Sequence, residues 1–221
     1  MLTSLEILRA LKTLNLLKNA PPLWWPGAGS FEVVVGAILT QNTRFEQAHK
    51  SLENLKSASA LNLHSLAHID LDILESCIKP SGFHRQKARY ITLLSQHILQ
   101  DFNTFEIFQK EVSRTWLLVQ KGIGFESADA ILNYACLRPV MVVDRYTYQL
   151  LKSLGLDLPD YSSLQEFFMH GIEADRDQTL SLYNHQLDLA SIYARFHGKI
   201  VACMRAKINL NSHLKGYHDL Y

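Results

Sequence analysis

The chain has 221 residues, of which 48% are hydrophobic and 19% are charged. This mixture is typical of a globular protein with a real core, and it argues against disorder. The 22 lysines and arginines nearly balance the 21 aspartates and glutamates, which excludes a histone-like polycation but leaves room for a local basic face that binds nucleic acid.

Hydropathy and cysteine content exclude further classes. No stretch of ~18 uncharged apolar residues occurs, so we expect no membrane span. The N-terminal segment contains three charged side chains within its first 17 residues and lacks the features of a secretory signal. Three scattered cysteines (Cys77, Cys136 and Cys203) form no disulfide framework and fit a reducing cytosol. Four thiolates usually hold an iron–sulfur cluster, so we expect none of the usual kind.

Helical spacing of apolar residues dominates the chain. Thr3 or Ser4 can cap the first helix, and Ser30 can cap the second. Prolines and Gly27 interrupt the chain between them. The predicted helices are residues 5–17, 31–38, 44–56, 70–78, 84–100, 105–119, 125–136, 144–154, 163–170 and 179–197. The apolar run 140–143 favours a strand but is only four residues long, so the predicted fold class is all-α.

Residues 115–128 carry the first informative motif, in which Gly122-Ile123-Gly124 separates two predicted helices. Glycines can adopt backbone angles closed to other residues, and they leave no side chain in the way of a ligand. Free amides at a helix start form a ready phosphate site, so we predict a helix-hairpin-helix that binds a phosphate, with Ser127 adding its hydroxyl. The alternative is an ordinary turn between two core helices.

Asp144 follows the apolar run 140–143 and precedes a predicted helix. One interpretation is a helix N-cap, where aspartate is favoured. The other is a carboxylate that emerges from the core into a cleft and faces a developing positive charge. Both hold together if the cap also fixes the carboxylate in the cleft.

Together, the Gly-Ile-Gly turn, the small residues after it and Asp144, twenty residues beyond Gly124, resemble the helix-hairpin-helix–Gly/Pro–Asp superfamily of DNA glycosylases, which includes endonuclease III. Residues 38–43 are similar to the first-helix signature of that family. Trp24-Trp25-Pro26 and residues 39–43, 122–132 and 193–199 resemble, more narrowly, the bacterial 3-methyladenine DNA glycosylase III branch.

The resemblance covers roughly residues 30–200. It implies two interleaved helical lobes with a cleft between them. The expected lobes are residues 31–136, with the helix-hairpin-helix at about 106–136, and residues 1–30 plus 137–221. In the cleft, the resemblance implies Asp144 and a flipped base.

Two departures from endonuclease III shape the expected chemistry. Bifunctional members carry a lysine two residues after the second hairpin glycine, where it forms an imine with the sugar. Here that position is Glu126, so we expect no lyase activity and water as the nucleophile. The C-terminal four-cysteine cluster of the family is also missing, since only Cys203 lies in that region.

The expected mechanism starts from base flipping, which costs a few kcal/mol. Asp144 then stabilises the oxocarbenium-like sugar and orients water. A methylated adenine is cationic and leaves readily, so selectivity depends on aromatic walls that attract a cation. The resemblance implies that Phe45, Trp24, Trp25 and Pro26 form these walls, although a tryptophan pair beside prolines can also cap a core.

Two charged residues near that pocket, Glu126 and Lys199, each have two interpretations. Glu126 can add negative charge to it or simply occupy a solvated helix start. Lys199 lies near the pocket by resemblance, where it would repel a cationic base unless it is deprotonated or carbamylated; the alternative is an ordinary surface lysine.

The expected DNA-facing residues are Gln41, Gly122, Gly124, Ser127 and Lys121. By resemblance Gln41 fills the gap left by the flipped base; the alternative is a surface polar residue or a cap. Further cations (His84, Arg85, Lys87, Arg89 and Lys110) either contact the DNA backbone or form a solvated face.

The ten histidines suggest no metal site. The resemblance implies a monovalent cation held by the hairpin carbonyls and no other cofactor.

The sequence thus predicts a monofunctional, cytoplasmic, nucleoid-associated DNA glycosylase, which acts as a monomer on double-stranded DNA with damaged bases and excises alkylated purines, chiefly 3-methyladenine. One alternative is an endonuclease III-like glycosylase for oxidised or mismatched bases. The other is a non-catalytic helix-hairpin-helix module that binds DNA.

Overall fold

The computed structural model describes residues 2–21 and 23–218. Over these residues the protein is all-α, with no strand, which confirms the predicted fold class. The chain separates into two compact units, Gly27–Leu137 and Met1–Pro26 with Arg138–Tyr221. One unit is therefore continuous, and the other combines both ends of the chain.

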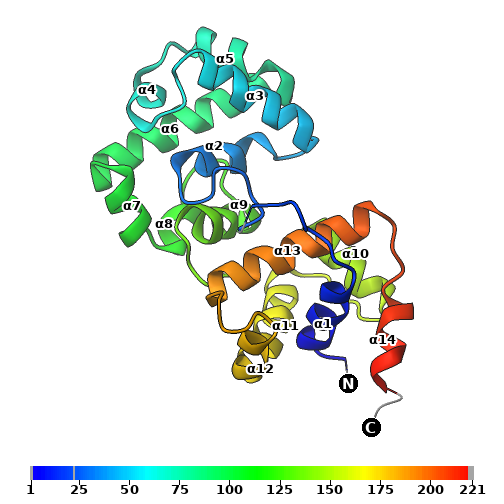
Figure 1. The fold of residues 1–221 in the computed structure, drawn as a ribbon. Helices are drawn as coiled ribbons and strands as arrows, with labels where there is room; N and C mark the ends of the chain where they lie inside the picture. The colour runs from blue at the N-terminus through cyan, green and yellow to red at the C-terminus, as the bar shows by residue number, and fades with distance from the viewer. Residues whose placement is uncertain (1, 22, 219–221) are drawn as a thin grey trace. The chain divides into compact units, whose positions relative to one another are not determined.

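The continuous unit contains the first group of helices in Figure 1. They are α2 (Phe31–Leu39), α3 (Phe45–Ser57), α4 (Leu63–His68), α5 (Leu71–Ile78), α6 (His84–Phe102), α7 (Phe105–Glu111), α8 (Arg114–Leu118) and α9 (Phe125–Ala130). All residues of α2 except Glu32 are buried, so this helix is the centre of the unit's core. Around it pack α3, α6 and α9.

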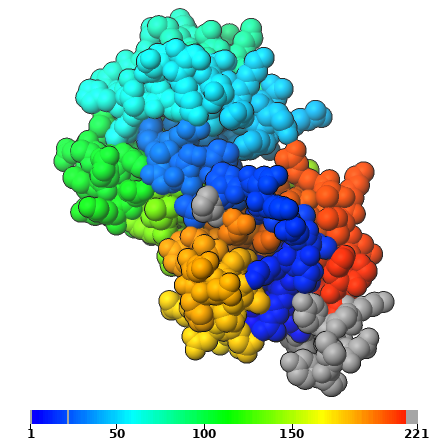
Figure 2. All heavy atoms as spheres, in the orientation of Figure 1, coloured from blue at the N-terminus to red at the C-terminus, as the bar shows by residue number. Residues whose placement is uncertain are grey.

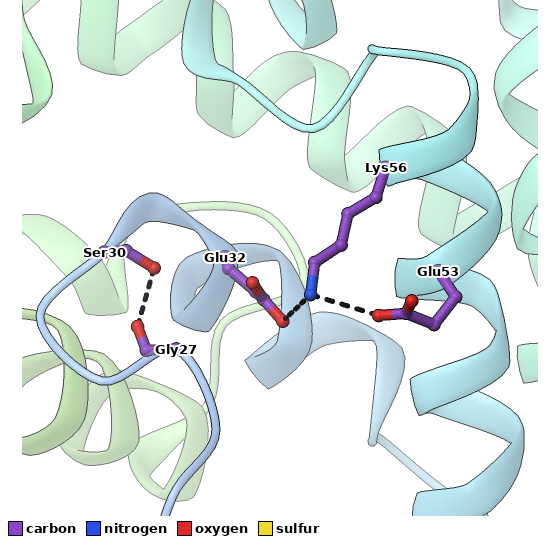
Figure 3. A network of polar contacts seen from close by, with 5 residues as sticks. All are labelled: Gly27, Ser30, Glu32, Glu53 and Lys56. Carbon is purple, nitrogen blue, oxygen red and sulfur yellow. Dashed lines mark hydrogen bonds and ion pairs between the residues drawn. The ribbon is translucent and has the colours of Figure 1, made fainter.

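An ion-pair network fixes the start of α2 (Figure 3). Lys56 Nζ of α3 lies 3.0 Å from Glu32 Oε1 and 3.0 Å from Glu53 Oε1. The hydrogen bond to Glu32 is the main reason why the pKa of Lys56 is raised. Ser30 occupies the predicted N-cap position but makes no side-chain cap bond, since its Oγ donates to Gly27 O instead.

The discontinuous unit is built from α1 (Ser4–Thr13), α10 (Arg145–Ser153), α11 (Tyr161–Ala174), α12 (Arg176–Ser181), α13 (Leu189–Arg205) and α14 (Asn211–His218). Thr3 caps α1 in a reciprocal capping box with Glu6, as predicted, whereas the alternative cap, Ser4, is buried and donates to Phe168 O. Helix α1 packs against α11, α13 and α14. Figures 1 and 2 both show the blue N-terminal segment among the orange and red C-terminal segments.

Three predicted helices differ from the observed ones for local reasons. The predicted helix 105–119 is divided into α7 and α8, since Ser113 Oγ accepts the amide of Trp116 and starts a new helix. The predicted helix 179–197 is interrupted by Asn184 and His185, which have left-handed backbone angles, before Asp188 caps α13. The predicted helix 125–136 ends as the π-helical turn Ile131–Ala135.

Other boundaries also differ. Helix α1 ends at Thr13, four residues before the predicted end, and α11 extends the prediction at both ends. Helices α4 and α14 were not predicted. The run 140–143 has no regular secondary structure and pairs with no strand in the described part of the chain; Met141, Val142 and Val143 are buried instead.

Candidate functional site

Asp144 is the N-cap of α10, which confirms one of its two interpretations. Its Oδ1 accepts hydrogen bonds from the backbone amide and the hydroxyl of Thr147, at 2.9 and 3.0 Å. The Thr147 hydroxyl also accepts the backbone amide of Asp144, which completes a capping box. One carboxylate oxygen is therefore fixed by the helix, and the side chain keeps 15% of its surface exposed.

The second carboxylate oxygen faces a histidine of α13. His197 Nε2 lies 3.4 Å from Asp144 Oδ2, and His197 is almost fully buried. Helices α10 and α13 pack against each other, and this places the two side chains together. The sequence interpretation did not select His197, because 53 residues separate it from Asp144 and only tertiary packing joins them.

Opposing effects act on the Asp144 carboxyl group. Burial raises its pKa, but the charge and hydrogen bonding of His197 and the hydrogen bonds from Thr147 lower it more strongly. The net result is a pKa below the ordinary aspartate value. Asp144 is thus an anion at neutral pH in a largely water-excluded position, where a negative charge acts strongly on a nearby cation.

Trp24 lies beside the same histidine. The two rings meet edge to face, with centroids 5.2 Å apart, and Trp24 also meets Trp25 edge to face at 5.7 Å. A Cβ added to Gly198 would come within 2.5 Å of the Trp24 ring, so only glycine permits this close packing on α13. Trp24 has a left-handed backbone with φ of 63°, which is unusual for a bulky residue.

Lys199 follows directly on α13 and is buried, contrary to its interpretation as an ordinary surface lysine. Its Nζ donates a 3.1 Å hydrogen bond to Leu16 O. Burial, together with the charges of Arg195 and Lys12, lowers the pKa of Lys199 to about 8. Lys199 therefore loses its proton more readily than an ordinary lysine.

The helix-hairpin-helix lies in the continuous unit, where α8 and α9 flank the turn Val119–Gly124. Gly122 has φ of +87°, and an added Cβ would come within 2.2 Å of the Tyr90 ring, so glycine is required there. Gly124 does not use such backbone angles, because its φ is −96°. A Cβ at Gly124 would meet open space, so glycine is not required there by packing. The missing side chain would instead allow a ligand to approach the backbone closely.

Gln41 and Ser127 make contacts within the protein. Gln41 Nε2 donates to Gly122 O at 2.8 Å and to Ser127 Oγ at 2.9 Å. These bonds tie the end of α2 to the hairpin. The predicted roles of Gln41 in filling a DNA gap and of Ser127 in binding phosphate remain predictions, and the first requires both bonds to open.

A partly buried ion pair joins the two hairpin helices. Arg114 of α8 donates Nε and Nη2 to the two carboxylate oxygens of Asp129 of α9, at 2.7 and 2.9 Å. Asp129 is fully buried. Such bidentate pairs fix geometry, so this pair holds α8 and α9 at a fixed angle.

The other predicted site residues lie at or near the surface. Phe45 begins α3 with 38% of its surface exposed, and its ring stacks on His49. Lys121 and Glu126 are exposed at the hairpin. Trp25 and Pro26 are partly exposed.

Lys87 does not form part of a DNA-facing surface, contrary to one interpretation. It is buried and donates to Leu39 O, Thr43 Oγ1 and Ser81 O at 2.7–2.9 Å. Burial lowers its pKa to about 8.

Within the described residues, no group of three histidine, cysteine, aspartate or glutamate side chains is placed to hold a metal ion. In the same part of the chain, no helix is long and apolar enough to cross a membrane.

Comparisons with known proteins identify the family of the chain. Residues 35–173 match a family model described as HhH-GPD superfamily base excision DNA repair protein. The chain is 33% identical over 185 residues to the provisionally named DNA repair glycosylase MJ1434 of Methanocaldococcus jannaschii. This alignment covers 80% of this chain and 78% of that protein. It is 27% identical over 125 residues to endonuclease III of Thermotoga maritima, which covers 57% and 56% of the two chains.

One solved structure is similar throughout. It is the H. pylori 3-methyladenine DNA glycosylase (MagIII) bound to 1,N6-ethenoadenine, with a TM-score of 0.92 and 54% sequence identity. The similarity covers 94% of this chain and 99% of that chain.

Proposed function

Because the chain belongs to the HhH-GPD superfamily of base excision DNA repair proteins, we propose that it is a monofunctional DNA glycosylase that hydrolyses the N-glycosidic bond of alkylated purines, chiefly 3-methyladenine. The observation that carries the proposal is the fixed, ionised Asp144 beside His197, whose ring in turn meets Trp24 edge to face. The 54% identity to a 3-methyladenine DNA glycosylase supports the choice of substrate.

Asp144 supplies the negative charge that the reaction needs. As the glycosidic bond breaks, the sugar becomes cationic, and a preorganised carboxylate stabilises that charge without reorganising. The capping box keeps the carboxylate in one orientation, and its lowered pKa keeps it ionised. The same carboxylate can orient the attacking water or accept its proton.

Recognition of the base rests on its charge. The face of an indole ring attracts a delocalised cation with about 0.5–2 kcal/mol, and Trp24 is held in position by Gly198 and His197. We expect Trp24, Trp25, Pro26 and Phe45 to contact the extruded base. A methylated adenine leaves without protonation, so tight binding of the cation is sufficient for selection.

The absence of a lysine two residues after Gly124 supports hydrolysis rather than strand cleavage. Glu126 occupies the position where bifunctional relatives carry a lysine, and a carboxylate cannot form an imine with the sugar. We therefore propose that water attacks the sugar and that no covalent intermediate with the enzyme forms.

Lys199 can tolerate a cationic base in its neutral form. Its lowered pKa, about 8, makes that form accessible at low cost, and a neutral amine is also the form that reacts to a carbamate. Either state would remove the repulsion between the lysine and a methylated base. We likewise propose that Glu126 adds negative charge to the pocket, which favours a cationic base.

We further propose that the enzyme acts as a monomer in the cytoplasm on double-stranded DNA and needs no cofactor apart from a monovalent cation at the hairpin. These points follow from the family resemblance. The cation can be tested by measuring DNA affinity in potassium and in a bulky organic cation at equal ionic strength.

Chromatography of the bases released from methylated duplex DNA tests the function. We expect 3-methyladenine to leave with the parent protein, and Asp144→Asn to slow release by about 10²–10³-fold while DNA binding persists. Release of thymine glycol but no methylated purine would favour the endonuclease III-like alternative. If neither protein releases a base and both bind DNA, the protein is a binding module.

A further inference from the structure

A groove of about 350 Å³ opens beside the hairpin, at a place that the proposed chemistry does not use. Its lining residues come from α6 and from the hairpin turn. They are Arg85, Gln86, Arg89, Tyr90, Leu93 and Lys121. We call it the α6 groove. Three of the six are cations and none is acidic.

The cations of the groove are accessible. The Arg85 side chain is 81% exposed, and Arg89 and Lys121 are also exposed. Arg85 Nε lies 3.6 Å from Glu75 Oε2, but an ion pair this exposed contributes little and does not prevent another partner from binding. A guanidinium group binds a phosphate through two parallel hydrogen bonds, so Arg85 and Arg89, whose exposed side chains border this mainly apolar groove, are suited to a phosphodiester.

The α6 groove is also fixed relative to the hairpin. The Tyr90 ring packs on Gly122 so closely that no side chain could fit between them. The hydroxyl of the same ring accepts a 2.7 Å hydrogen bond from Gln86 Nε2. Phosphates bound at the hairpin and in the groove would therefore be a fixed distance apart, as successive phosphates of one DNA strand are.

We propose that the α6 groove binds a backbone phosphate of the DNA beyond the one held by the hairpin, through Arg85 and Arg89. The inference rests on the proposed action on DNA. It extends the contact with the substrate from the hairpin turn along the first half of α6. Since the contact is to phosphate, it adds affinity without sequence preference.

The salt dependence of binding to an undamaged duplex tests the proposal. The variant is Arg85→Gln/Arg89→Gln, which leaves Lys121 and the hairpin intact. The matched control is Lys152→Gln/Lys207→Gln, which removes the same charge from exposed positions elsewhere. Each lost phosphate contact reduces the slope of log K against log salt concentration by about 0.9.

We expect the groove variant to lose about one unit of slope and to bind about tenfold more weakly at low salt, while the control keeps the parent slope. Base release from a saturated complex should stay within about twofold of the parent, because neither arginine touches the reacting atoms. Equal slopes for the groove variant and the control would overturn the proposal. If the parent protein releases no base, that result counts against the proposed function. The salt-dependence slopes would still show whether the α6 groove binds a phosphate.

Discussion

The contact between His197 and Asp144 gives the sharpest prediction about the chemistry. Replacing His197 by leucine keeps much of its volume but removes the polar group next to Asp144 Oδ2. Because His197 helps to lower the pKa of Asp144 and burial raises it, the pKa of Asp144 rises in this variant. Less of the carboxylate is then ionised at a given pH, so the acid limb of the activity profile moves to higher pH.

The size of the effect follows from the contact itself. A hydrogen bond to a charged group contributes about 1.5–3 kcal/mol, and each 1.4 kcal/mol is about tenfold in rate. The Nε2–Oδ2 distance of 3.4 Å is longer than an ordinary N–H···O hydrogen bond, so we take a value at or below the low end of that range. We therefore expect His197→Leu to slow base release by about tenfold at neutral pH and by more under acidic conditions.

His197→Gln separates positioning from packing. Its side-chain amide can supply a donor near the position of Nε2 but no charge, so it should recover part of the rate and return the acid limb part of the way toward the parent value. The assay is single-turnover release of 3-methyladenine from duplex DNA as a function of pH, with thermal unfolding as a check on folding. An acid limb at the parent pH in His197→Leu would refute the argument, because a loss of packing alone lowers the rate equally at every pH.

Four further predictions follow from other contacts. Gly198→Ala should displace Trp24, so we expect a higher KM for methylated DNA with a smaller change in kcat; an unchanged KM would show that Trp24 does not contact the base. Borohydride should trap no covalent adduct with abasic DNA, because Glu126 cannot form an imine, and a trapped adduct would contradict that role. Lys87→Met removes the hydrogen bonds that Lys87 donates to three oxygens and should lower the free energy of unfolding in urea by about 1–3 kcal/mol, whereas an unchanged midpoint would show that those bonds contribute nothing. Because the pKa of Asp144 is lowered in the folded protein, its contribution to stability is fully present above the ordinary aspartate pKa and is lost as the pH falls through the folded-state pKa. Asp144→Asn should therefore flatten this acidic part of the plot of unfolding free energy against pH. An unaltered plot would argue against an ionised carboxylate.

The sequence predicted those features that depend on local rules. Thr3 and Asp144 are caps because a short polar side chain before a helix can bond to its first free amides, and both positions were visible in the sequence. The two-glycine turn was equally visible, since Gly122 needs a positive φ. Local spacing also located most helices to within a few residues.

Features that depend on tertiary packing could not be predicted in the same way. The break after α12 depends on two residues with left-handed backbone angles, Asn184 and His185, which helix propensity does not anticipate. Lys87 looked like part of a basic surface, because it lies among cations in the sequence, yet one face of α6 is buried and Lys87 lies on it. Gln41 was expected to face DNA, but the structure gives its amide two partners in the hairpin.

Three consecutive residues of α13 show most clearly why the contacts in the site could not be predicted from the sequence alone. Adjacent residues on a helix point in directions about 100° apart, so each of the three meets a different neighbour. His197 reaches Asp144, Gly198 receives the ring of Trp24, and Lys199 binds the carbonyl of Leu16. A small rotation of α13 would disturb all three contacts together. Substitutions in the packing between α13 and α10 should therefore reduce catalysis and base binding together, even where they touch neither the base nor the sugar.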